Sequence, residues 1–363
     1  MNKDNKNNKV GRRRLKLSLI ITASVLAFFI LSSQIAGIAV YEVIFNRRIE
    51  PVEWQSFSVS DFEGVFAKRK TFANDRGETL VGYVYSTQGD TSEGLVVFSH
   101  GMGSGGHVAY MPLIVALVNE GYTVFAYDAT ANGESEGESL RGLPQGISDL
   151  NSAIDFIKED NQYTSLPLFL VGHSWGAYSA GSALAFHNDV EAAVLISGFD
   201  SSMSMMVNDA KEYVGEPIML ISKPFLKLYD RFKFGKLSDA SVYKGVSGSD
   251  AYVLVVHSSD DVDAPVDIGY NMLYEDFSES ERVDFLLYED RGHGYIYYSA
   301  NSALYRDSLN KKYEQYVSEN GGKDDDKLES EFMKDELDRD AFFEVDAELI
   351  ERIEQTFKKS SQG

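Results

Sequence analysis

The stretch FLVGHSWGAYSAG, from Phe169 to Gly181, places one serine, Ser174, between two glycines. It contains the pattern Gly-x-Ser-x-Gly, with Gly172 two residues before the serine and Gly176 two residues after it. An apolar run typical of a buried strand precedes the pattern, and small residues typical of a closely packed helix follow it. Such a setting turns the backbone sharply and raises the hydroxyl above the sheet. We therefore interpret Ser174 as a nucleophile rather than as part of a chance glycine loop.

A serine hydroxyl needs a base to remove its proton near neutral pH. Among the six histidines, His293 lies between two glycines in EDRGHGY, in the loop after the last predicted strand. A loop at that edge can bring an imidazole to Ser174, so His293 is the predicted base, and a turn histidine near the surface is the alternative. His173 neighbours the serine, but its side chain should leave the turn in another direction. His257 ends a strand and should be satisfied in the core.

The base needs a carboxylate to fix its tautomer and to stabilise its charged form. The loop HSSDDVDAPV follows the predicted strand 251–257 and offers three acids, Asp260, Asp261 and Asp263. One carboxylate suffices, so at least one of the others should be solvated or should cap the next helix. The spacing alone leaves the choice among them open.

The developing oxyanion needs hydrogen-bond donors, and a glycine-rich loop can supply them from the backbone. FSHGMGSGG follows the predicted strand 94–99. We expect one donor to be the backbone N–H of Trp175, directly after the serine, and the other to be the N–H of Met102 in this loop.

The same loop also fits a dinucleotide-binding pattern, Gly-x-Gly-x-x-Gly from Gly101 to Gly106, with Asp128 about 20 residues later. Pro112 argues against this alternative, because it most naturally occupies the first turn of a helix that then begins well after the glycines. A dinucleotide site would also leave Ser174 and His293 unexplained. No zinc-protease pattern occurs. We therefore expect no cofactor and no metal.

Predicted strands and helices alternate from residue 94 onward, which indicates an α/β fold with a mostly parallel sheet and helices on both faces. Residues 199–245 interrupt the alternation with a segment rich in Met, Phe, Leu and Lys. We expect a helical cap over the carboxyl edge of the sheet, and a long ordinary crossover is the alternative. Near the end of the chain, apolar residues from Phe342 to Phe357 recur at helical spacing, with Asp346 placed to cap. That helix should dock on the domain.

The N-terminus has the pattern of a membrane anchor. Residues 1–16 carry seven Lys/Arg and one acid, and residues 17–41 carry no charge. At about 1.5 Å per residue the uncharged run can cross a hydrocarbon core of roughly 30 Å. The basic cluster places 1–16 in the cytoplasm and the rest outside. A cleaved signal peptide, followed by secretion, is the alternative, but the apolar core of a signal peptide has only about 7–15 residues.

The chain has 363 residues, no cysteine and a net charge of −22. Disulfides, zinc–thiolate sites and thiol catalysis are therefore excluded. Because residues 1–16 contribute +6, the remainder carries −28, and such an acidic body should repel nucleic acid.

Over residues 65–358 the sequence resembles the α/β-hydrolase superfamily, most closely its bacterial serine-aminopeptidase-like and lysophospholipase-like members. The motifs that carry the resemblance are HGMGSG, YDATANGES, VGHSWGA, VVHSSDDVDAP and RGHG, in the family's order. The family's Asp-x-x-x-Pro pattern implies that Asp261 is the triad acid, with Asp260 as the fallback. Two departures are Ser258, where the family has glycine after histidine, and Thr130-Ala131, where it has Arg-Gly.

The expected organisation is a cytoplasmic segment (1–16), a transmembrane anchor (17–41), a tether (42–64) and an α/β-hydrolase domain (65–363) with its cap. We expect an extracytoplasmic serine hydrolase of the carboxylesterase or lipase type. Its partners would be a small or lipid-like ester and the bilayer, through the N-terminal helix. The alternatives are a serine peptidase of the same fold and a non-catalytic binding domain. The sequence alone does not separate them.

Overall fold

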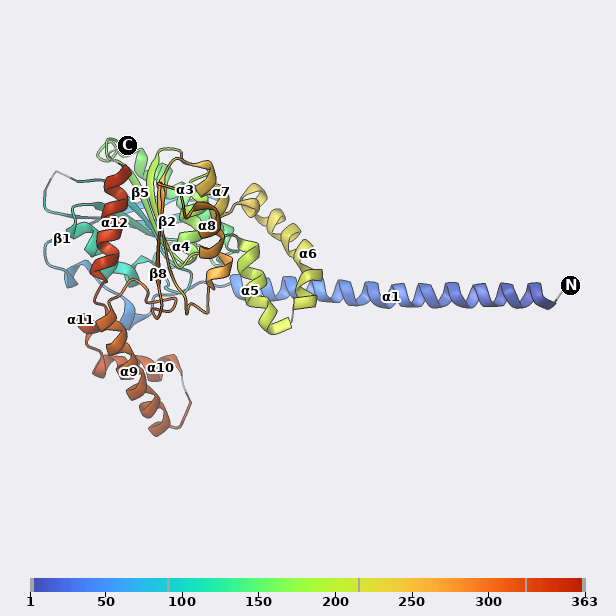
Figure 1. Cartoon of the computed structure of the whole chain (residues 1–363). Helices are drawn as coiled ribbons and strands as arrows, with labels where there is room; N and C mark the ends of the chain where they lie inside the picture. Colours follow the sequence, from blue (N-terminus) through green and yellow to red (C-terminus); the bar gives the residue numbers. More distant parts are fainter. Residues whose placement is uncertain (1–2, 90–91, 215, 324, 361–363) are drawn as a thin grey trace.

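A computed structural model describes residues 3–89, 92–214, 216–323 and 325–360, with side chains described outside 3–12 and 210–220. One eight-stranded sheet forms its centre, in the order β1-β2-β4-β3-β5-β6-β7-β8 (Figure 1). β2 runs antiparallel to β1 and β4, and the pairs from β4 to β8 are all parallel, so the expected mostly parallel sheet is confirmed. The strands are β1 (Val65–Ala73), β2 (Thr79–Thr87), β3 (Leu95–Ser99), β4 (Thr123–Asp128), β5 (Leu168–His173), β6 (Val190–Ile196), β7 (Tyr252–Ser258) and β8 (Val283–Tyr288).

Alternate side chains of the inner strands enter two separate cores, as expected for a sheet buried on both faces. In β3, Leu95 and Val97 pack with α3 and α4, whereas Val96 and Phe98 pack with α2 and α12. The covering helices are α2 (Met111–Asn119), α3 (Pro144–Lys158), α4 (Trp175–Ala183), α7 (Val242–Gly248), α8 (Tyr270–Phe277) and α12 (Ala347–Ser360). Two-sided cover explains the continuous apolar runs of the central strands.

The N-terminal helix α1 (Lys3–Phe45) leaves the body as a single long rod (Figure 1). Its apolar side chains are exposed from Leu15 to Leu31, and the helix is long and apolar enough to cross a membrane. Its last turns differ, because Tyr41 and Phe45 are buried in the main core. The segment expected to be a tether also contacts the domain, through Trp54, which is buried, among others.

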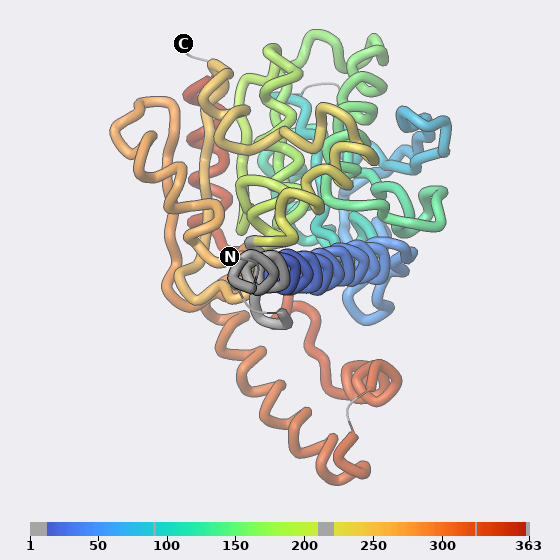
Figure 2. The backbone as a smooth tube through the Cα atoms, turned by 90° about the vertical axis from the view of Figure 1, so that its right-hand side faces the viewer, coloured from blue at the N-terminus to red at the C-terminus, as the bar shows by residue number. Residues whose placement is uncertain are grey.

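The interruption at 199–245 forms two long helices, α5 (Ser202–Val214) and α6 (Glu216–Phe234), before α7. They lie on the side of the body from which α1 leaves (Figure 1). The same arrangement is visible in Figure 2, where the view runs along α1 and the yellow cap segment lies next to it.

The chain ends in α9 (Ala300–Glu319), α10 (Asp326–Glu336), α11 (Arg339–Phe342) and α12. Asp346 accepts hydrogen bonds from the backbone N–H groups of Glu348 (2.9 Å) and Leu349 (3.3 Å), so the expected N-cap of α12 is present. Phe357 stacks on Phe169 of β5, with ring centroids 4.2 Å apart. The expected docking of the last helix is therefore confirmed.

Candidate active site

Ser174 lies in a tight turn between β5 and α4. Its backbone has φ 55° and ψ −115°, a region that costs energy for any residue with a Cβ. Its N–H donates to the Ile196 carbonyl of the neighbouring strand (2.8 Å), which holds the turn in place. A Cβ on Gly172 would lie 2.2 Å from the Gly176 carbonyl oxygen. The first glycine of the motif is therefore required because the end of β5 and the start of α4 lie so close together.

Gly176 is required for a different reason, because it touches the end of β3. A Cβ there would lie 1.9 Å from the Ser99 carbonyl oxygen, a backbone atom that cannot swing aside. We expect Gly176→Ala to lower the free energy of unfolding by about 4 kcal/mol or more, or to prevent folding. Thermal unfolding of the detergent-solubilised chain measures this. Gly248→Ala is the matched control, since a Cβ on Gly248 in α7 meets nothing within 4 Å, and equal losses in the two variants would contradict the explanation.

The structure brings the three predicted side chains together at the carboxyl edge of the sheet. His293 Nε2 lies 2.8 Å from Ser174 Oγ, and His293 Nδ1 lies 2.8 Å from Asp261 Oδ2. A carboxylate can only accept, so Nδ1 carries the hydrogen and Nε2 is free to accept the serine proton. Ser174 and His293 are partly exposed, whereas Asp261 is buried. A substrate can therefore reach the Ser174 hydroxyl, while the Asp261 carboxylate is shielded from solvent.

Asp261 is held from several directions. Its Oδ1 accepts from the Ala264 N–H (2.8 Å), and its Oδ2 lies 3.3 Å from His257 Nε2 as well as beside His293. Burial pushes the pKa of Asp261 up, but the hydrogen bonds from His257 and His293 outweigh it and leave that pKa below the usual range. The Asp261 carboxylate is therefore ionised near neutral pH, where His293 would act as the base.

The other acids of the loop have different positions. Asp260 Oδ1 accepts from Ser258 Oγ (2.5 Å) and from the Gly292 N–H (2.9 Å), and Asp263 is exposed. Ser258 Oγ in turn accepts from the Arg291 N–H (3.0 Å). The serine that departs from the family's pattern thus helps to join the acid loop to the loop that carries the histidine.

The two expected oxyanion donors lie on segments that adjoin the nucleophile turn. Trp175 follows Ser174 directly, and its own side chain is fixed by an indole N–H bond to the Leu143 carbonyl (2.7 Å). The loop with Met102 lies against the turn, because a Cβ on Gly101 would be 3.2 Å from His173 Nδ1. The Met102 loop therefore contacts the residue before the serine, and Trp175 is the residue after it. The Met102 side chain is partly buried against the main core.

A chain of hydrogen bonds that the sequence did not predict joins these parts. The Gly101 N–H donates to Tyr110 Oη (3.0 Å), Tyr110 Oη lies 2.9 Å from His173 Nδ1, and His173 Nε2 lies 2.9 Å from the His293 carbonyl oxygen. The carbonyl can only accept, so Nε2 carries the hydrogen and Nδ1 accepts from the tyrosine. His173 thus ties the oxyanion loop to the backbone of the candidate base.

Stability should depend on the protonation state of His173. Burial, followed by the nearby His293, lowers the pKa of His173 to about 3, below its ordinary 6.5. The unfolded chain therefore binds this proton first, and the stabilisation lost is about 1.4 kcal/mol for each pH unit below 6.5. We expect His173→Gln to lose less stability than the native chain between pH 7 and pH 5. Urea unfolding at both values checks this, and parallel losses would contradict it.

Asp128, the acid of the dinucleotide alternative, is buried and occupied by protein groups. Its Oδ1 accepts from His107 Nδ1 (2.6 Å) and from the His107 N–H (2.9 Å), and its Oδ2 accepts from the Glu134 N–H (2.9 Å). His107 Nε2 is bonded to Tyr85 (2.8 Å). Asp128 therefore holds the loop after β3 and the loop after β4 together.

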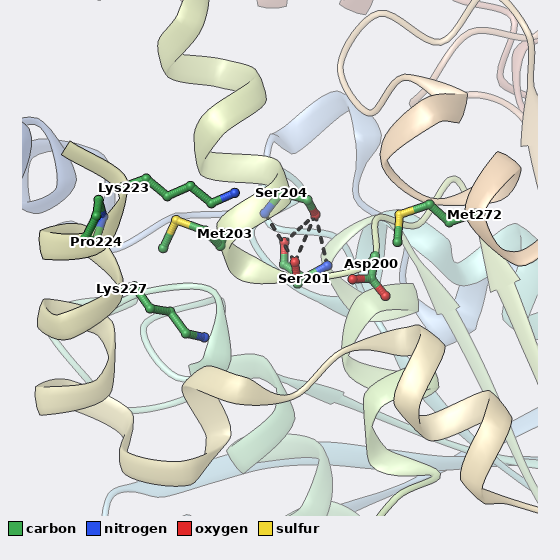
Figure 3. A pocket seen from close by; sticks show the side chains of 8 residues that line it. All are labelled: Asp200, Ser201, Met203, Ser204, Lys223, Pro224, Lys227 and Met272. Atoms are coloured by element: carbon green, nitrogen blue, oxygen red, sulfur yellow. Dashed lines mark hydrogen bonds between the residues drawn. The ribbon is translucent and has the colours of Figure 1, made fainter. Parts of the chain in front are cut away.

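A cavity of about 560 Å³ lies between the two cap helices (Figure 3). None of the three candidate triad residues lines it. Asp200, which lines the cavity, follows β6 closely, on the same sheet edge as the nucleophile turn. The lining residues are Asp200, Ser201, Met203, Ser204, Lys223, Pro224, Lys227 and Met272.

Comparison with known proteins gives a family match and a fold. Residues 90–239 match the family described as serine aminopeptidase, S33, a span that contains Met102, Ser174 and Trp175. An esterase of Pyrococcus furiosus, in two crystal forms, is similar at 18% identity over 75% of this chain and 98% of the esterase, with TM-scores of 0.53 and 0.54. An acylaminoacyl peptidase of Pyrococcus horikoshii is similar at 17% identity over 65% of this chain and 39% of its own, with a TM-score of 0.47. No curated protein sequence matches.

Proposed function

The chain is a member of the α/β-hydrolase superfamily, and from that premise we propose that it is a membrane-anchored serine hydrolase that cleaves carboxylic esters. One observation carries the proposal, the continuous line of contacts from Ser174 Oγ through the His293 ring to Asp261. Each distance is short enough for proton transfer or orientation, and the nucleophile is partly exposed.

The reaction would follow the acyl-enzyme route. Ser174 Oγ attacks the ester carbonyl carbon while its proton moves to His293 Nε2, and Asp261 stabilises the imidazolium that forms. The N–H groups of Met102 and Trp175 would donate to the oxyanion. Collapse breaks the bond to the alcohol, which leaves with the proton from Nε2. Water, deprotonated by the same nitrogen, then releases the acid and regenerates the serine.

The composition of the cap cavity favours an ester over a peptide with a free amino terminus. An aminopeptidase needs carboxylates to bind the ammonium group of its substrate. Among the residues whose side chains the structure describes, Asp200 is the one acid that lines the cavity, and its Oδ1 already accepts from the Tyr243 N–H (2.9 Å). Lys223 lines the same space and would repel an ammonium group, whereas the charge of Lys227 is paired with Asp239 (2.8 Å). The apolar lining residues suit an acyl chain.

Peptide hydrolysis stays the second candidate because the matched family is described as a serine aminopeptidase. Rates on p-nitrophenyl esters of increasing chain length, compared with aminoacyl p-nitroanilides, separate the two functions. We expect turnover of the esters, lost in Ser174→Ala. Turnover of the anilides alone would favour the peptidase, and no turnover on either panel would favour a binding domain.

We further propose that α1 spans a membrane with its basic end in the cytoplasm. The chain has no cysteine, so one introduced cysteine is a unique label. We expect a membrane-impermeant maleimide to label Ser278→Cys on intact cells, because Ser278 is exposed on the catalytic domain. Asn5→Cys should react only after the membrane is opened. Labelling of Asn5→Cys on intact cells would contradict this orientation.

A further inference from the structure

Helix α6 presents an apolar stripe to the outside of the molecule. Ile221, Phe225, Leu228 and Phe232 are exposed to 49%, 43%, 64% and 86%. Their spacing of four, three and four residues puts them within about 60° of arc on the helix. A helix that faces water carries polar residues at such positions. The stripe therefore indicates contact with an apolar partner.

A different face of α6 is bound to the end of α1. Tyr41 of α1 donates to Asp230 Oδ1 (2.9 Å), and both Tyr229 and Lys233 donate to Glu42 (2.7 Å each). Asp230 is almost fully buried, and the rings of Tyr41 and Tyr229 meet edge to face. These contacts fix α6 to the last turns of α1, so the position of α6 relative to a bilayer follows that of α1.

The exposed apolar surface of α1 reaches the level of the cap. Val40 and Val43 are exposed to 49% and 78%, on the same turns of α1 that bind α6. Both cap helices also lie on the side of the body from which α1 leaves (Figures 1 and 2). A bilayer that surrounds α1 would therefore meet the cap before any other part of the catalytic domain.

We propose that α6 docks on the outer surface of the bilayer that α1 spans, with the side chains of Ile221, Phe225, Leu228 and Phe232 inserted at the boundary between headgroups and acyl chains. This inference rests on the membrane anchoring proposed above. It makes the cap a second point of membrane contact beside the anchor. The substrate would then be an ester that resides in the bilayer rather than in water.

The charges of α6 agree with a phospholipid surface. The exposed polar side chains of residues 221–234 are basic, Lys223 and Arg231, and the one acid in this range, Asp230, is buried. The chain as a whole carries −22, so an anionic leaflet would repel most of its surface. An apolar stripe with flanking Lys and Arg is typical of helices that lie in the membrane interface.

Docking would bring the cap cavity to the lipid. Lys223 and Lys227 of α6 and Met203 of α5 line that cavity and project into it (Figure 3). A bilayer ester could enter between the two helices with its acyl chain against methionine and its polar part near the lysines. It would not have to cross water on the way to the sheet edge that carries Ser174.

The test measures the surroundings of Phe232 without using activity. The full chain is reconstituted in vesicles of phosphatidylcholine and phosphatidylglycerol, with a nitroxide on Phe232→Cys, and its collisions with oxygen and with a water-soluble nickel chelate are compared. Leu304→Cys is the matched control, because Leu304 is an apolar residue exposed to 70% on α9, on another side of the body (Figure 1). We expect oxygen to dominate at 232 and the nickel chelate to dominate at 304.

Two outcomes would overturn the proposal. One is a nitroxide at 232 that meets the nickel chelate as often as the nitroxide at 304 does. The other is spin–spin broadening at 232, which would show that a second copy of the chain covers the stripe. A lipid-exposed nitroxide in a protein without esterase activity would support docking and count against the proposed function, so the two failures are distinguishable.

A second measurement links docking to the substrate. We expect the triple substitution Phe225→Ser, Leu228→Ser, Phe232→Ser to reduce hydrolysis of a long-chain ester embedded in vesicles by roughly tenfold or more, because several apolar side chains lose their burial. Hydrolysis of p-nitrophenyl acetate in water should not change, since none of the three contacts the candidate triad. Equal rates of the variant and the native chain on the embedded ester would contradict the proposed role of the stripe.

Discussion

Replacing Ser174 by alanine is expected to lower kcat/KM on a p-nitrophenyl ester by roughly 10⁵–10⁶-fold. The alanine removes the hydroxyl that lies 2.8 Å from His293 Nε2 and leaves the rest of the turn in place. Steady-state rates of the purified full chain measure the loss. Catalysis that survives at more than a residual level would mean that another group attacks the ester.

The loss must be separated from unfolding. Ser174 adopts a positive φ, and alanine has the same Cβ, so the substitution should not change the strain of the turn. The temperature of unfolding should therefore stay within a few degrees of the native value, since substitutions that add no clash and bury no unpaired group usually change stability by less than about 1 kcal/mol. A large drop in that temperature would leave the assignment to rest on His293 and Asp261.

Asp261→Asn should lower kcat by roughly 10⁴-fold, because an amide cannot stabilise the imidazolium and can force the wrong tautomer on His293. The effect should appear in kcat more than in KM, since Asp261 is buried behind the imidazole and touches no substrate. Rates measured from pH 6 to pH 9 give the loss across the range.

Asp260→Asn is the matched control for that experiment. Asp260 lies next to Asp261 in the sequence but bonds Ser258 Oγ and the Gly292 N–H instead of the imidazole. An asparagine oxygen can accept both of these bonds, so we expect a loss below roughly tenfold. The reverse order of the two losses would assign the acid role to Asp260.

Much of the architecture follows from short stretches of sequence. The glycines around Ser174 predict the nucleophile turn because their positions are set by clashes within a few residues of it. The apolar runs of β3 to β7 predict a sheet covered on both sides, since each strand supplies both cores by itself. Asp346 predicts the start of α12 in the same local way, because an N-cap side chain bonds the first turn of its own helix.

The parts that the sequence did not predict depend on partners far apart in the chain. His173 bonds Tyr110, 63 residues before it, and the carbonyl of His293, 120 residues after it. His257 is buried in the core, as expected, and its Nε2 bonds the Ala264 carbonyl (2.7 Å), but the sequence did not predict that it also lies beside Asp261 and helps to lower the pKa of that carboxyl. Nothing in the local pattern marks these contacts, which exist only once the carboxyl ends of neighbouring strands meet at one edge.

The contact between the anchor helix α1 and the cap helix α6 also joins residues far apart in the chain, so the sequence did not predict it. Residues 42–64 read as a tether because they lack a strong pattern, but Glu42 bonds Lys233, 191 residues later. The cap therefore holds the end of α1 directly. A fragment that begins at residue 46 would lose Tyr41, Glu42 and their bonds to α6, so the full chain is the proper material for all the assays above.

The most direct test is to react the full chain with a fluorophosphonate and to locate the adduct by peptide mass mapping. These reagents trap serines that a neighbouring base activates. We expect one adduct, on Ser174, which disappears in Ser174→Ala and forms far more slowly in His293→Ala. An adduct on another residue, or labelling of Ser174 at the native rate without the His293 imidazole, would contradict this expectation.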